Sequence, residues 1–96
     1  MKDMSREDLK TTLLIMMEEC AEVTQAASKI LRFGLDNSYE GVSNRAHLET
    51  EIGDLLFLFD LLKECSIIDP ENVAKATEAK RDKLARWSNL QVKLGH

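Results

Sequence analysis

The chain has 96 residues, of which 44% are hydrophobic, and a formal net charge of −4. This length fits a single small domain over residues 1–96, and the negative charge argues against binding to a nucleic acid polymer. No apolar run approaches the roughly 20 residues of a membrane span, and the acidic N-terminus is unlike a signal or transit peptide. We therefore expect a cytoplasmic protein without membrane association.

The first predicted helix starts at Ser5 and runs to about Arg32. Ser5 and Asp8 are spaced as in a capping box, and apolar residues then recur at steps of three and four, the period of one helix face. Gly34 is expected to end this helix, because glycine readily adopts the backbone conformation found after helix ends. The polar, turn-forming segment 35–42 predicts a loop.

Two further helices follow this loop. Ser43 or Asn44 can cap the second, and residues 55–62 are apolar on nearly every side, which predicts a central, buried helix. Asp69 and Pro70 suit the cap and first position of a third helix.

The third helix is predicted to extend to about Lys93, and no segment has the pattern of a strand. The fold class is therefore all-α, a bundle of three main helices. Three helices leave an apolar face open, and a chain this short buries only about 60–65% of its unfolded surface. We expect oligomerisation to complete the bundle, as a homodimer or homotetramer.

Two acidic pairs lie inside the most apolar helical stretches. They are Glu19 with Glu22, and Glu51 with Asp54. Residues three apart share a helix face, and each pair continues a line of apolar residues. A carboxylate in such a position costs free energy unless a partner compensates it. Four of them suggest a hard divalent cation such as Mg²⁺, which prefers oxygen ligands.

The alternative is that these acids are ordinary solvated groups. Asp54 and Gly53 argue against it, because aspartate is a poor mid-helix residue and glycine costs about 1 kcal/mol there relative to alanine. A close approach by the first helix or by a ligand would account for Gly53. Glu18 flanks the same face as Glu22, and three roles stay open for it: a further ligand, a general base or a solvated group.

A basic face follows on the third helix. Lys80, Lys83 and Arg86 are spaced by three. Beside an acidic metal site they suit phosphate binding, because phosphoryl chemistry needs the charge on the phosphate oxygens to be neutralised. Ion pairs along the helix are the alternative for any one of them.

Two aromatic side chains border the loop. Phe33 and Tyr39 could contact a nucleobase, although both are ordinary at helix ends. His47 is interpreted as a surface or capping residue.

The two acidic segments together resemble the signature of a known protein family. EECAE at residues 18–22, followed after 28 residues by EIGD at residues 51–54, resembles the EExxE…ExxD signature of MazG-like nucleoside triphosphate pyrophosphohydrolases. KLARW at residues 83–87 resembles the K-x-x-R element of that family, and short segments between residues 32 and 49 are similar to the short phage-type members. The resemblance implies an all-α dimer or tetramer.

The resemblance also implies hydrolysis of a (d)NTP to (d)NMP and pyrophosphate, in control of the nucleotide pool. Mg²⁺, which Mn²⁺ can replace, would be bound by Glu19, Glu22, Glu51 and Asp54. The phosphates would be held by Lys83 and Arg86, with Lys80. A water activated by the cation would attack, oriented or deprotonated by Glu18 or Glu22 as the catalytic residue. The base that is preferred does not follow from these motifs.

Other functions compete with this one. Dimeric dUTPases and phosphoribosyl-ATP pyrophosphohydrolases carry similar acidic pairs; the former are typically longer, and the latter usually have a basic, glycine-containing stretch that is absent here. A non-catalytic helical interaction module would use the acids only for solubility, which Asp54 disfavours. A di-iron bundle needs Glu-x-x-His pairs, and Glu51-x-x-Asp54 contains no histidine.

Overall fold

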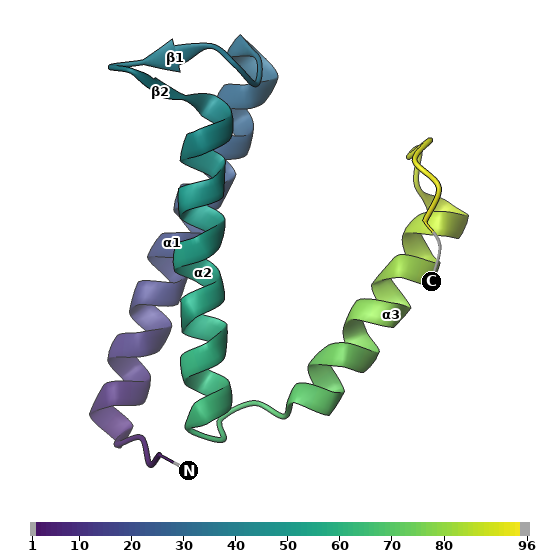
Figure 1. Ribbon diagram of the computed structural model, residues 1–96. Helices are drawn as coiled ribbons and strands as arrows, with labels where there is room; N and C mark the ends of the chain where they lie inside the picture. The colour runs from purple at the N-terminus through teal and green to yellow at the C-terminus, as the bar shows by residue number, and fades with distance from the viewer. Residues whose placement is uncertain (1, 95–96) are drawn as a thin grey trace.

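Three helices and one short hairpin make up the computed structural model, which describes residues 2–94 (Figure 1). In chain order the elements are α1 (Arg6–Phe33), β1 (Ser38–Tyr39), β2 (Val42–Ser43), α2 (Asn44–Glu64) and α3 (Pro70–Trp87). The predicted all-α class is confirmed, since the two strands have only two residues each. No helix within residues 2–94 combines the length and hydrophobicity needed to cross a lipid bilayer.

The predicted helix starts are confirmed by their capping bonds. The side chains of Ser5, Ser43 and Asp69 each accept a backbone N–H of the following turn, at 3.0, 3.0 and 2.9 Å. Such bonds satisfy donors that have no partner inside the helix. At the other end of α1, Gly34 has a φ of +93°, a conformation that favours glycine, and it ends the helix as expected.

The segment between α1 and α2 is a hairpin rather than an unstructured loop. Glu40 and Gly41 both have positive φ, at +52° and +81°, as the tightest hairpin turns require. The antiparallel strands pair Ser38 with Ser43 and Tyr39 with Val42. The prediction of no strand is therefore wrong here, because two-residue strands are too short to give an alternating pattern.

The core lies between α1 and α2, which pack side by side (Figure 1). The buried apolar side chains of the described residues are Ala26, Leu58 and Leu62. The prediction of a central, buried helix over residues 55–62 is wrong for the single chain: Phe57 and Phe59 are 64% and 41% exposed. A pair of helices can cover only one face of each member, so the outer faces stay exposed.

The third helix diverges from this pair (Figure 1). None of the residues in α3 is buried, and the helix does not pack along α1 or α2. It ends at Trp87 rather than near Lys93, because Ser88 is extended and its hydroxyl donates to the carbonyl of Leu84. A serine that bonds the backbone in this way competes with helix continuation.

Candidate metal centre

Acidic side chains from α1 and α2 converge where the two helices meet. One carboxylate oxygen from each of Glu19, Glu51 and Asp54 lies within 4.8 Å of the others. Carboxylate oxygens at this spacing suit a hard divalent cation. The structure thus brings together three of the four predicted metal ligands, although their role as ligands stays a prediction.

Glu19 has the least favourable environment of the three. Its Oε2 atom is buried and accepts no hydrogen bond from any residue between 2 and 94. Burial raises the pKa of the Glu19 carboxyl, and the negative charges of Asp54 and Glu51 raise it further. Because a buried carboxylate oxygen normally has a partner, this donor set fits a bound cation.

The fourth predicted ligand, Glu22, belongs to a neighbouring group. One ligand atom each from Glu22, His47 and Glu51 lies within 4.8 Å of the others, so Glu51 is common to both groups. The Nε2 atom of His47 lies 3.3 Å from Oε1 of Glu51. The interpretation of His47 as a surface or capping residue missed this contact, which its spacing of four residues before Glu51 could have indicated.

Two residues beside the ligands differ from expectation. The space at the Cβ position of Gly53 is open, so the predicted close approach of α1 to this glycine is wrong. Glu18 is exposed and belongs to neither group of converging ligand atoms. Its catalytic role stays a prediction, and its geometry does not favour a role as a ligand.

The predicted phosphate-binding residues lie elsewhere. Lys80, Lys83 and Arg86 are on α3, which diverges from the α1–α2 pair, so one chain does not bring them beside the acids (Figure 1). All three are exposed. Their role in substrate binding stays a prediction that the single chain alone does not favour.

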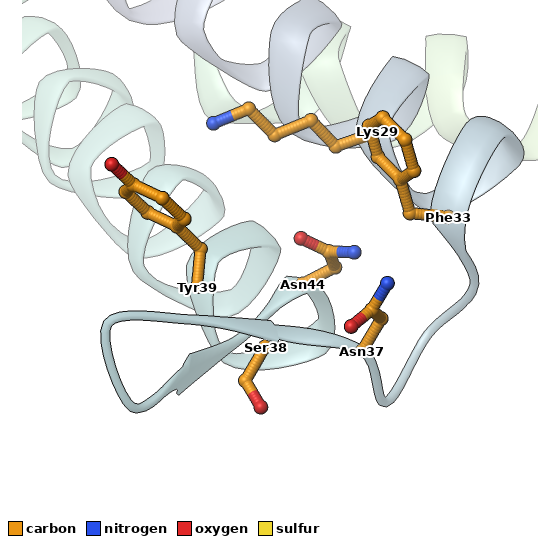
Figure 2. Close-up of a pocket in the computed structure, with 6 residues that line it drawn as sticks. All are labelled: Lys29, Phe33, Asn37, Ser38, Tyr39 and Asn44. Carbon is orange, nitrogen blue, oxygen red and sulfur yellow. The ribbon is translucent and has the colours of Figure 1, made fainter.

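A pocket of about 390 Å³ lies at the hairpin end of α1 and α2 (Figure 2). It is lined by Lys29, Phe33, Asn37, Ser38, Tyr39 and Asn44. The sequence indicated the two aromatic residues only. The others were missed because polar residues in a loop and a lysine on a helix are common on any surface.

Comparison with protein families identifies the chain. The model of the MazG nucleotide pyrophosphohydrolase domain matches residues 7–85. The chain belongs to this family. The match includes both acidic pairs and Lys83, and it confirms the resemblance on which the sequence interpretation relied. Parallel comparisons with curated proteins and with solved structures found no match.

Family membership implies a hydrolase of the nucleotide pyrophosphohydrolase class. Four of the five acids that carry the family signature converge between α1 and α2, and Glu18 is the exception. The helical fold is also the one that the resemblance implied.

Proposed function

We propose that this MazG domain hydrolyses a nucleoside triphosphate to the monophosphate and pyrophosphate, with Mg²⁺, in control of the nucleotide pool. One observation carries the proposal: Glu19, Glu51 and Asp54 converge, and a buried oxygen of Glu19 has no partner within the described chain. Mn²⁺ would substitute, because it accepts the same oxygen ligands.

The proposal gives each acid a task. Glu19, Glu51 and Asp54 would hold the cation, with Glu22 completing the set. When bound, the cation would neutralise phosphate oxygens and lower the pKa of an attacking water. We assign Glu22 to orient or deprotonate that water in preference to Glu18, because Glu22 belongs to a group of converging ligand atoms and Glu18 does not.

His47 would hold Glu51 in place through the 3.3 Å contact of its Nε2 atom. A histidine that supports a ligating carboxylate fixes the direction of its lone pairs. His47 is therefore a positioning residue in this proposal.

We further propose that the phosphate-binding cations come from a second copy of the chain. The single chain leaves large apolar side chains exposed on its helices, such as Phe57 at 64% and Trp87 at 81%. Extended apolar surface of this kind usually closes against a partner. If α3 of one copy lies along the α1–α2 pair of the other, apolar surface is buried and Lys80, Lys83 and Arg86 reach the acids.

Pyrophosphate release from a panel of standard and modified (d)NTPs tests the reaction. We expect turnover of at least one nucleotide with Mg²⁺ and none with excess chelator. Chromatography should identify the monophosphate and pyrophosphate, and no diphosphate. A folded protein that turns over no nucleotide in the panel would refute the proposed activity.

A further inference from the structure

We infer that the pocket at the hairpin end binds the nucleobase, and that Lys29 selects bases with a carbonyl group at the position where adenine and cytosine have an amino group. These carbonyl bases are guanine, with its oxygen on C6, and thymine and uracil, with the oxygen on C4. The inference rests on the proposed function, and it names the specificity-determining part of the same site. The acidic side chains would bind the cation, but they lie too far along the helices from this pocket to contact the base.

The position of the pocket matches the length of a nucleotide. Lys29 follows Glu22 by seven residues on α1, and Asn44 precedes Glu51 by seven residues on α2, so each lies about 10 Å along its helix from that one acid. The two displacements run toward the same end, because the hairpin joins α1 and α2 there (Figure 1). A nucleotide whose phosphates lie at the acids would place its base in this region.

A second hollow adjoins the pocket and includes His47 in its lining. Its volume is about 290 Å³, and it shares Lys29, Tyr39 and Asn44 with the pocket. It is also lined by His47, whose Nε2 atom contacts Glu51. The lining of this hollow therefore extends from the pocket to the histidine that contacts Glu51.

The lining suits a flat heteroaromatic ring. Figure 2 shows Tyr39 and Phe33 at opposite ends of the pocket, with the amides of Asn37 and Asn44 between them. The two aromatic side chains are 75% and 56% exposed, so their rings are accessible. Aromatic rings stack on bases without regard to sequence, and amides can read the polar edge.

Hydrogen bonds fix the hairpin that forms one wall. Asn44 is buried, its Nδ2 donates to the Gly34 carbonyl at 2.9 Å, and its backbone N–H donates to the Asn37 carbonyl at 2.9 Å. The Arg45 guanidinium binds the Asp36 carboxylate through two bonds of 3.1 and 3.2 Å. A wall held in this way needs little ordering when a ligand binds.

Lys29 is the only cation in this lining, and it is half-buried. It forms no ion pair with any residue from 2 to 94, although acids are abundant in the chain. Its stem runs along the pocket and its ammonium group lies toward Tyr39 (Figure 2). An ammonium group only donates hydrogen bonds, so it can bind the carbonyl oxygen on C6 of guanine or C4 of thymine and uracil. It cannot bond to the amino group that adenine and cytosine have at the same position.

The test compares kcat/KM for dGTP, dTTP, dUTP, dATP and dCTP with the full chain. We expect the three carbonyl bases to be favoured by about tenfold or more, the effect of one charged hydrogen bond. Lys29→Met should remove this preference by lowering kcat/KM for the carbonyl bases only. Lys10→Met, the same change at an exposed position of α1, should leave the profile unchanged. Tyr39→Leu should raise KM for all five.

Two results would overturn the inference. An equal loss for all five nucleotides in Lys29→Met would assign Lys29 to the phosphates. A wild-type profile without preference, or one that favours dATP and dCTP, would exclude carbonyl selection.

Binding of dGMP and dAMP to the metal-free protein, followed by NMR, separates this inference from the proposed activity. Tighter binding of dGMP that Lys29→Met abolishes would support the pocket even if no triphosphate were hydrolysed. Absence of binding, together with active turnover that ignores the base, would refute the pocket and leave the proposed reaction intact. Absence of both would refute both.

Discussion

The α1–α2 pair and α3 are built from equally clear helical sequences, yet they differ in what surrounds them. In the pair, two helices pack together and converge their acids within 4.8 Å. In α3, the cap and the helix form as predicted, but no residue is buried and no partner helix lies alongside. The comparison teaches that capping and periodicity decide whether a helix forms, whereas long-range packing decides where its functional side chains lie.

Replacing the converging acids of the α1–α2 pair should have the largest effect, which is a loss of turnover. Glu19→Gln and Asp54→Asn should each lower turnover by about a hundredfold or more, since even supporting residues of metal sites are worth 10–100-fold. Measurements of pyrophosphate release and of helicity by circular dichroism check this. Glu49→Gln, an exposed acid on α2, is the matched control and should retain activity. If both ligand variants kept normal turnover, the metal centre would have been assigned to the wrong residues.

Changes on α3 should have the next largest effect and should reveal whether the site is shared between copies. Lys83→Met with Arg86→Met should reduce kcat/KM by about ten- to a hundredfold, because two charged contacts to phosphate are lost. Mixing this inactive protein with Glu19→Gln protein should restore about a quarter of wild-type activity. After random exchange of equal amounts, half of all dimers would be mixed, and each mixed dimer would contain one intact site out of two.

Subunit exchange before the assay is the control for that experiment. Failure to restore any activity after exchange would mean that α3 serves its own chain. The contrast between the two regions would then reflect the conformation of α3 and not the need for a second copy.

Removing an exposed apolar side chain should weaken the oligomer. We expect this effect to be smaller than the effects on turnover above and larger than the effect of pH below. Phe57→Ser should raise the dissociation constant of the oligomer about tenfold or more, because burial of a phenylalanine side chain contributes about 1.5–3 kcal/mol. Sedimentation over a range of protein concentrations measures this. A wild-type protein that stays monomeric at every concentration would contradict the proposed assembly.

A change of pH should have the smallest effect, and it should act on the folding stability of the metal-free protein. Because the pKa of Glu19 is raised above 4.5, the fold favours its protonated form. Its contribution to stability is fully present below pH 4.5 and is lost as the pH rises through the raised pKa. Thermal unfolding is measured in the presence of chelator at a series of pH values. As the pH increases, the Tm of Glu19→Gln should therefore fall less than the Tm of the wild type.

Addition of Mg²⁺ completes that measurement. The cation should raise the Tm of the wild type, since a ligand that binds only the folded state stabilises it, and should raise that of Glu19→Gln far less. An equal increase in both proteins would place the cation elsewhere.

The sequence by itself determined the three helices, their caps and the acidic signature. Ser5, Ser43 and Asp69 act within one helical turn, so their bonds depend on near neighbours in the chain. The signature at residues 18–22 and 51–54 likewise needs only the order of residues to indicate the family.

Tertiary structure alone decided which of these side chains meet. The packing of α1 against α2 placed Glu19 with Glu51 and Asp54, and it placed Glu22 with His47 and the same Glu51. It also placed Lys29 beside the hairpin pocket. Contacts between residues distant in the chain depend on the angle and register of packed helices, which helical periodicity does not specify.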